Sequence, residues 1–485
     1  MYKRVFKVLL VCFFSVFLYI NGTAQNNVGY NIKATIKPFT TGKCYLAHYY
    51  LNDKNYVLVD SADVNNKSTV IFKSATTLKQ GIYVIGFPNK AGLIQVLIDK
   101  QQSFAVVLNS ANPNSAVYTN SKVNTDYIAY QNFVSTRGIK LDSLKKEYDK
   151  LADKSKSQPL ITRSETLTKE IDKYRDEYIK KESTTVLALL LQAAKYPTIP
   201  QASQHPKAKY DTAWARNYYV SNYWAGVDFA DDRLLRTPFF EQKLNNFFTN
   251  VIIDGDSVFK YIDLMLLYSK HNNDMFKYYI NKFTADYFSP KYGGQEKVFV
   301  KLYEKYYNNI KYDWLTPANE KIIREKAYTT MANLVGDFAY NFTLTDINNK
   351  STTLYNIKAN YTILCFWDPT CGHCKTIVPQ LDSFYLNKWQ SYNIKVIGIM
   401  VNNETKEWEK FIADKKLNTW MHLYRNPEIL KTEKEQGTDL RTLYDAYTTP
   451  RIFLLDTEKR IIARAIEPPQ LDTILQYKIF GKIKN

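Results

Sequence analysis

The stretch that decides the fold of the C-terminal region is Tyr361-Thr-Ile-Leu-Cys-Phe-Trp367, which is followed by Cys371-Gly372-His373-Cys374 and by Lys375-Thr-Ile-Val-Pro-Gln-Leu381. The first segment is an apolar run typical of a buried strand, and the last has the pattern of a helix. Two thiols separated by two residues can close a small disulfide and reopen it. At a helix N-terminus, free backbone N–H groups and the helix dipole stabilise a thiolate, so we expect the first cysteine to be the nucleophile. The stretch therefore predicts redox chemistry.

The first 24 residues have the pattern of a cleavable export signal. Positive residues come first, an apolar run follows over 8–20, and small residues at 22–24 predict cleavage after Ala24. The apolar run is short for a membrane span. Cys12 would suggest a lipid anchor, but Val11 precedes it where a lipoprotein signal needs a small residue. We expect a soluble mature chain in the periplasm or cell envelope, with no transmembrane segment.

Length and composition indicate a multidomain globular protein. The chain has 485 residues, of which 45% are hydrophobic and 15% aromatic, and roughly three domains is the expectation for this length. Its formal net charge is +18. The lysines are scattered among Tyr and Asn without a tight basic run or a nucleic-acid-binding motif, so we expect no nucleic-acid partner.

Two kinds of pattern precede the C-terminal region. Residues 25–121 contain short alternating runs separated by turn-rich pieces, which predicts an antiparallel β domain. Residues 122–333 change to helical spacing and are rich in aromatics, which we interpret as core positions of an α-helical region. Two amphipathic helices joined through Ser157-Gln-Pro159 should form an antiparallel hairpin.

Residues 334–485 alternate between strand and helix patterns and predict an α/β sheet with the two thiols at a strand end. A hairpin-like entry is expected over 338–346. The expected strands cover 361–367, 394–401, 451–456 and 460–465. The expected helices cover 372–389, 404–415, 439–447 and 470–480.

This region resembles the thioredoxin superfamily, and most closely the exported thioredoxin-like proteins of the bacterial cell envelope. The resemblance depends on Phe366-Trp367 before the two thiols, on the Cys-Gly-His-Cys motif, and on Pro379 five residues after Cys374. It also depends on Tyr447-Thr-Thr-Pro-Arg-Ile-Phe-Leu-Leu-Asp456, which is similar to the cis-proline segment of that family. A lone CxxC would be a weak signal, but these motifs occur together and in order.

The resemblance implies a role for each site residue. Cys371 is the attacking thiol, Cys374 the resolving thiol, and Cys371–Cys374 the redox-active disulfide. The Thr449-Pro450 bond is expected to be cis beside the sulfurs, since only an X-Pro bond is cis at low cost. Trp367 should lie beneath the disulfide.

The dipeptide between the cysteines bears on the redox potential. Gly-His is the pair of protein disulfide isomerases, whose potential is about −180 mV against about −270 mV for thioredoxin. An imidazole near the thiolate favours the reduced form, so His373 should place this couple nearer the isomerase end.

Two positions depart from the family pattern. Thr370 stands where a tryptophan often precedes the first cysteine, and Cys365 stands where thioredoxin has a buried acid. Without that carboxylate, another residue or a water must accept the proton of Cys374. Asp368 is near in sequence, but the sequence leaves the direction of its side chain open.

The predicted function is thiol–disulfide exchange with cysteine-containing exported proteins, with a membrane redox partner and no cofactor or metal. The direction of electron flow stays open. Zinc would need more ligands, because there is no second CxxC, and covalent haem would need a histidine where Lys375 stands. Of the histidines, only His373 has a functional case; the others are His48, His205, His271 and His422. Two alternatives remain: a structural disulfide, or an envelope binding protein that uses the thioredoxin-like fold as a scaffold.

Overall fold

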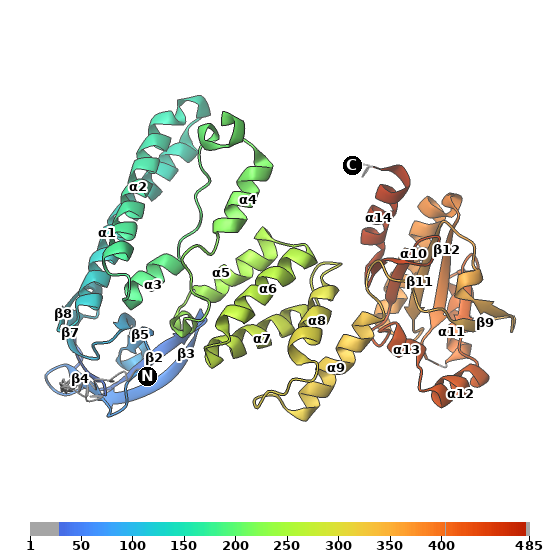
Figure 1. Cartoon of the computed structure of the whole chain (residues 1–485), viewed down its shortest axis with the longest axis horizontal. Helices are drawn as coiled ribbons and strands as arrows, with labels where there is room; N and C mark the ends of the chain where they lie inside the picture. The colour runs from blue at the N-terminus through green and yellow to red at the C-terminus, as the bar shows by residue number, and fades with distance from the viewer. Residues whose placement is uncertain (1–28, 403, 482–485) are drawn as a thin grey trace, which may run out of the picture. The chain divides into compact units, whose positions relative to one another are not determined.

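The computed structural model describes residues 29–402 and 404–481 of the chain (Figure 1). The predicted export signal and Cys12 lie outside these residues. The described chain forms two compact units. The first contains the residues up to 196 together with 233–242, and the second contains 197–232 and the residues from 243 onward. The predicted boundaries after residues 121 and 333 stay predictions.

The first unit contains two four-stranded sheets, in the orders β4-β1-β7-β8 and β3-β2-β5-β6. Their strands are β1 (Asn31–Lys37), β2 (Lys43–Tyr50), β3 (Asn52–Asp63), β4 (Thr69–Lys73), β5 (Gly81–Gly86), β6 (Leu93–Ile98), β7 (Ser103–Asn109) and β8 (Asn112–Thr119). Alternate residues of both sheets enter one core, which includes Cys44. The expected β domain is confirmed, with one difference, because β1 pairs with β7 in parallel. The sequence reading missed β8, which is polar and takes its strand form from pairing with β7.

A helical hairpin follows the sheets in the first unit. It consists of α1 (Lys122–Lys150) and α2 (Gln158–Lys181), and α3 (Val186–Ala193) comes next. Arg137 of α1 pairs with Glu170 of α2, and Lys122 pairs with Glu182 just after α2, as an antiparallel arrangement requires. The predicted hairpin is therefore confirmed. Residues 233–242 return to the sheet, where the backbone N–H of Leu51 donates to Leu235 O.

The second unit begins with the remaining helices of the middle region. These are α4 (Thr212–Asn222), α5 (Phe240–Asn246), which crosses the boundary between the units, α6 (Gly255–Ser269), α7 (Asn273–Phe288), α8 (Glu296–Leu302) and α9 (Pro317–Met331). Many of their aromatic residues are buried, including Phe240, Tyr279 and Phe283. The aromatic stripes are thus core, as expected.

The C-terminal region is a seven-stranded mixed sheet in the order β10-β9-β13-β12-β11-β14-β15. Its strands are β9 (Thr343–Asp346), β10 (Ser351–Thr353), β11 (Tyr361–Trp367), β12 (Ile394–Met400), β13 (Met421–Tyr424), β14 (Arg451–Leu455) and β15 (Ile461–Arg464). Its helices are α10 (Gly372–Phe384), α11 (Thr405–Asp414), α12 (Pro427–Gln436), α13 (Leu440–Leu443) and α14 (Pro468–Phe480). This is the predicted thioredoxin-like arrangement.

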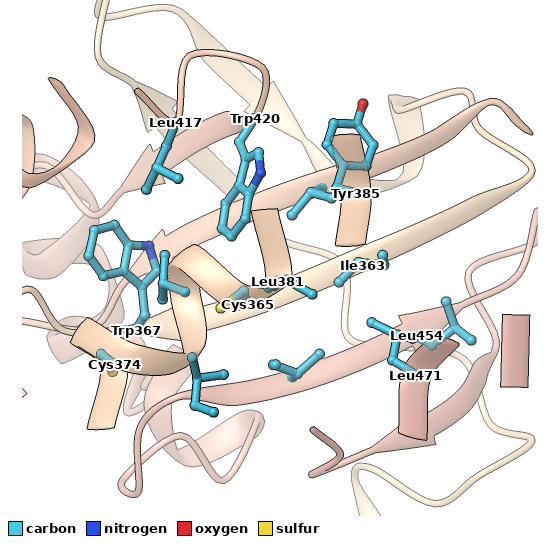
Figure 2. Packing of buried hydrophobic residues seen from close by; sticks show 14 of the residues in the cluster. Ile363, Cys365, Trp367, Cys374, Leu381, Tyr385, Leu417, Trp420, Leu454 and Leu471 are labelled. Carbon is cyan, nitrogen blue, oxygen red and sulfur yellow. The ribbon is translucent and has the colours of Figure 1, made fainter. Parts of the chain in front are cut away.

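Strand β11 lies inside this sheet, between β12 and β14. Ile363, Cys365 and Trp367 face a core that also contains residues of α10, α11 and α14 (Figure 2). Leu364 and Phe366 face a second core on the other side of the sheet. Because both faces are covered, β11 is apolar throughout rather than alternating.

Four elements differ from the expected ones. The hairpin expected over 338–346 is formed by β9 and β10 and covers 343–353 instead. The helix expected over 439–447 has only four residues, because Asp445 takes a left-handed conformation with φ of 51°. Neither α12 nor β13 was expected. β13 is short and lacks a strand-like pattern, and pairing with β12 and β9 makes it a strand.

Candidate functional site

The two thiols of the CxxC motif occupy different environments at the start of α10. Cys371 is the N-cap residue, so its half-buried side chain stands beside the unpaired backbone N–H groups of the first helical turn. Cys374 lies within the first turn and is completely buried. The first sulfur is therefore the one that a substrate can reach.

Burial and hydrogen bonding give the two thiols different pKa values. Burial alone would raise the pKa of Cys371, but hydrogen bonds from the Cys374 backbone, the Thr449 side chain and the backbone of His373 outweigh it and bring the pKa below its ordinary value. Burial raises the pKa of Cys374 to about 12. Cys371 is thus the more readily ionised of the two thiols, and Cys374 stays protonated at neutral pH.

The segment around Thr449 lies against the first sulfur. Sγ of Cys371 is 3.5 Å from the backbone oxygen of Thr449. The Thr449-Pro450 peptide bond is cis, as the resemblance implied. Hydrogen bonding from the Thr449 side chain also acts on Cys374, where it partly offsets the effect of burial on the pKa. Thr449 is thus placed to influence both sulfurs.

Trp367 and His373 differ in their exposure to solvent. Trp367 is fully buried at the end of β11, and its ring centroid is 5.2 Å from that of Phe411. His373 is exposed, and it acts on the Cys371 sulfur through its backbone N–H. The proposed effect of its imidazole on the redox potential stays a prediction.

The structure shows the direction of the Asp368 side chain. Its carboxylate Oδ1 accepts hydrogen bonds from the backbone N–H and the hydroxyl of Thr370, at 2.7 and 2.6 Å. Its backbone N–H, not its carboxylate, lies 3.5 Å from Sγ of Cys374. The Asp368 carboxylate therefore shapes the turn before the helix, and the contact of Asp368 with Cys374 is made by its backbone N–H.

A row of three residues crosses the sheet at the position where thioredoxin has a buried acid. Cys365 pairs with Gly398 on β12, and Gly398 pairs with His422 on β13. A Cβ atom at Gly398 would lie 3.0 Å from both Nδ1 of His422 and Nε1 of Trp367. The glycine therefore lets two polar rings approach the sheet above it.

His422 is the site neighbour that the sequence reading missed. It is buried, and its Nε2 donates to Leu417 O at 2.8 Å, which leaves Nδ1 as the unprotonated nitrogen. Within the described part of the chain, this Nδ1 and Nε1 of Trp367 are buried without a hydrogen-bond partner. Burial lowers the pKa of His422 to about 4, so the ring is neutral at pH 7. No sequence signal pointed to it, because no strand was expected at 421–424.

Cys365, the other buried thiol near the site, is not suited to react. Burial, together with the nearby Cys374, raises the pKa of Cys365 well above its ordinary value. Across residues 29–402 and 404–481, no group of three or more His, Cys, Asp or Glu side chains is arranged to hold a metal ion. In the same ranges, no helix combines the length and the apolar character needed to cross a membrane.

Comparison with known proteins agrees with this geometry. Residues 335–464 match the model of the AhpC/TSA family. The thiol-disulfide oxidoreductase ResA of Bacillus thuringiensis subsp. konkukian is 23% identical over 128 residues, which are 26% of this chain and 67% of that protein. ResA of Bacillus cereus strain ZK is 21% identical over 132 residues, which are 27% of this chain and 69% of that protein.

The chain also matches solved structures along part of its length. A thioredoxin-like protein from Bacteroides caccae has 21% identity and a TM-score of 0.44, with 58% of this chain and 97% of that chain covered. A domain of a possible thiol-disulfide isomerase from Cytophaga hutchinsonii has 36% identity and a TM-score of 0.27, with 31% of this chain and 97% of that chain covered. From the matched family model and the sheet that carries the CxxC motif, the C-terminal region of this chain is an AhpC/TSA-type thioredoxin-like domain.

Proposed function

We propose that the protein exchanges disulfides with cysteines of exported proteins in the cell envelope, using Cys371 and Cys374. The observation that carries this proposal is the asymmetry of the two thiols. Cys371 is half-buried at a helix N-terminus with a lowered pKa, whereas Cys374 is buried with a pKa of about 12. One accessible nucleophile beside one protected thiol is the arrangement that exchange requires.

The proposed reaction has two steps. In the first, the Cys371 thiolate attacks a substrate disulfide, a bond forms between Cys371 and one substrate sulfur, and the other substrate sulfur leaves as a thiolate. In the second, Cys374 loses its proton and attacks Sγ of Cys371, which closes the Cys371–Cys374 bond and releases the second substrate sulfur. Two electrons pass from the protein to the substrate, and the two released substrate thiolates take up protons, including the one lost by Cys374.

The reverse sequence oxidises a substrate dithiol, and the potentials of the partners decide the direction. A membrane redox partner is proposed to reset the pair after each cycle. The envelope location is supported by the export-signal pattern of residues 1–24.

The test is to trap the mixed disulfide. In Cys374→Ser the second step is blocked, so substrates should stay joined to Cys371 and appear as high-mass bands that a reductant removes. The Cys371→Ser variant should trap nothing, and Cys44→Ser serves as a matched control with both site thiols present. Trapping through Cys374 in the Cys371→Ser variant would contradict the assigned roles.

A further inference from the structure

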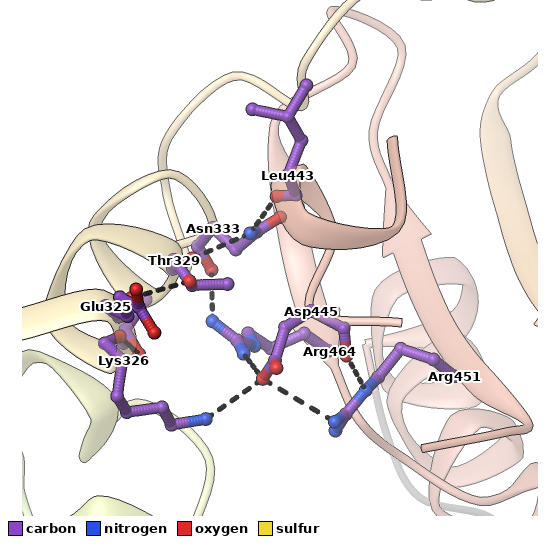
Figure 3. A network of polar contacts seen from close by, with 9 residues as sticks. Glu325, Lys326, Thr329, Asn333, Leu443, Asp445, Arg451 and Arg464 are labelled. Atoms are coloured by element: carbon purple, nitrogen blue, oxygen red, sulfur yellow. Dashed lines mark hydrogen bonds and ion pairs between the residues drawn. The ribbon is translucent and has the colours of Figure 1, made fainter. Parts of the chain in front are cut away.

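Asp445 lies at the centre of an ion-pair network that joins the helical region to the thioredoxin-like domain within the second unit (Figure 3). Its carboxylate Oδ2 is 3.0 Å from Nζ of Lys326 on α9. The same oxygen is 3.3 Å from Arg464 of β15 and 3.5 Å from Arg451 of β14. One carboxylate thus holds three cations from three different elements.

The network has one buried cation and continues beyond the carboxylate. The side chain of Arg464 is only 4% exposed, and its Nη1 donates to the backbone oxygen of Asn333 at 3.1 Å. The side-chain amide of Asn333, which follows α9, donates to Leu443 O at the end of α13. The end of α9 is therefore connected both to β15 and to the segment that leads into Asp445.

Asp445 also begins the segment that reaches the active-site sulfur, here called the 445–450 loop. Its backbone oxygen accepts a hydrogen bond from Nε of Arg451 at 2.9 Å, which closes the base of this loop. Four residues later, Thr449 contacts Sγ of Cys371 through its backbone oxygen. Because so few residues separate the two contacts, a shift at Asp445 moves Thr449 relative to the sulfur.

The charges explain why Asp445 is the central residue. Without its carboxylate, Arg464 would be a buried guanidinium next to Arg451 and Lys326 that keeps only Glu296 as an acidic neighbour, and a buried charge that loses part of its compensation is unfavourable. Arg451 and Arg464 come from the thioredoxin-like domain itself. Lys326 brings the third charge from the helical region, with its side chain 20% exposed.

We propose that Asp445 is a positioning residue through which α9 holds the 445–450 loop against the sulfur of Cys371. This inference rests on the proposed function of Cys371 as the attacking thiol. It gives the helical region a role in the chemistry, namely keeping Thr449 against the sulfur, where hydrogen bonding from the Thr449 side chain lowers the pKa of Cys371.

The test uses the full chain in its reduced form. Lys326→Met removes the charge contributed by α9 and leaves Asp445 with both arginines. Asp445→Asn removes the carboxylate but keeps the size of the side chain and suits the left-handed backbone, with φ of 51°. Lys321→Met is the matched control, because Lys321 is also on α9 and makes only an exposed ion pair with Glu325 at 3.7 Å among the contacts described.

The rate of Cys371 alkylation is measured against pH, with peptide mass spectrometry to identify the modified thiol. A thiol that loses Thr449 should titrate at higher pH. At pH 7 we expect the alkylation rate to fall about threefold in Lys326→Met and about tenfold in Asp445→Asn, where tenfold corresponds to one pKa unit. Lys326→Arg should restore the wild-type profile, and Lys321→Met should match it.

The outcomes separate this inference from the function on which it rests. A network that only holds the domains together would lower the melting temperature of Lys326→Met and leave its alkylation profile unchanged, and that result overturns the inference. If Asp445→Asn does not fold, the alkylation profiles of Lys326→Met and Lys326→Arg still test the inference. If wild-type Cys371 itself titrates like an ordinary thiol, the proposed function fails instead.

Discussion

The N-terminal sheets and the C-terminal sheet both bury a cysteine inside a strand, yet only the C-terminal region has a thiol suited to chemistry. Cys44 of β2 and Cys365 of β11 are both fully buried, and burial raises the pKa of each. The two strands differ in the element that comes next along the chain. β2 leads into another strand, so its neighbouring backbone groups pair within the sheet, whereas β11 leads into a helix whose first N–H groups are free to meet a sulfur.

The element that follows a strand, rather than the number of cysteines, therefore decides whether a region offers an accessible thiol. A strand in a sandwich supplies an apolar environment that keeps a thiol protonated. A strand-to-helix junction supplies unpaired donors and partial exposure at one position. Predictions that contrast the two regions test this directly.

The largest contrast should be in thiol reactivity. Burial raises the pKa of Cys44 to about 11, whereas the pKa of Cys371 lies below its ordinary value of 9.0. Each pKa unit changes the thiolate fraction about tenfold. Cys371 at pH 7 should therefore react at least about 100-fold faster with iodoacetamide than Cys44. An acid with a raised pKa stays protonated to higher pH, so the Cys44 rate should keep rising until pH reaches about 11, while the Cys371 rate levels off earlier.

Timed alkylation of the reduced native protein, followed by peptide mass spectrometry, measures both rates. The same protein in denaturant provides the control, in which all thiols should react alike. Similar alkylation rates for the two cysteines in the native protein would show that the strand-to-helix junction does not raise thiol reactivity.

A smaller contrast should appear between ion pairs of the two units. Arg425 in the C-terminal region has a side chain that is 8% exposed, and it pairs with Asp439 at 3.0 Å and donates to Val401 O at 2.7 Å. Arg425 also pairs at 3.3 Å with Glu433, whose side chain is 17% exposed. Arg137 of the helical hairpin is 23% exposed, and its partner Glu170 is 44% exposed. Arg425→Met should lower the free energy of unfolding of its unit by about 3 kcal/mol, and Arg137→Met by less than about 1 kcal/mol.

Hydrogen exchange read peptide by peptide reports the loss within each unit separately. Protection of the peptides that contain β13 and α12 should fall in Arg425→Met, and protection of α1 and α2 should change little in Arg137→Met. Equal losses of protection in the two variants would mean that the more buried ion pair does not contribute more to stability.

The smallest contrast concerns two strand glycines. A Cβ at Gly398 would lie 3.0 Å from His422 Nδ1 and from Trp367 Nε1, whereas at Gly86 the nearest atom would be 3.8 Å away. Gly398→Ala overpacks the core beside the site and should cost about 1–3 kcal/mol. Gly86→Ala should change stability by no more than about 0.5 kcal/mol.

Urea unfolding of both variants, followed by tryptophan fluorescence and circular dichroism, compares them. A Gly398→Ala protein as stable as Gly86→Ala would show that His422 and Trp367 move aside easily. The close approach of these rings above Gly398 would then be unimportant for the core.

The sequence determined the parts of this protein that depend on neighbouring residues. The strand at 361–367, the helix that starts after Cys371 and the placing of both cysteines at the start of that helix all follow from one continuous stretch, because strand pattern, helix start and cysteine spacing are local properties. The predicted roles of Cys371 and Cys374 agree with their different exposure, and the cis bond at Pro450 followed from a recognisable segment.

Only the tertiary structure decided the contacts between distant segments. Lys326 and Asp445 lie 119 positions apart, and no local pattern predicts that they meet. His422 comes to lie in one row with Gly398 and Cys365 through the register of two strand pairs, one of which involves a strand without a sequence signal. The direction of the Asp368 carboxylate was likewise set by a turn rather than by residue type. Pairing, register and side-chain direction depend on how separate segments pack, and the residues that determine this packing are spread over the whole chain.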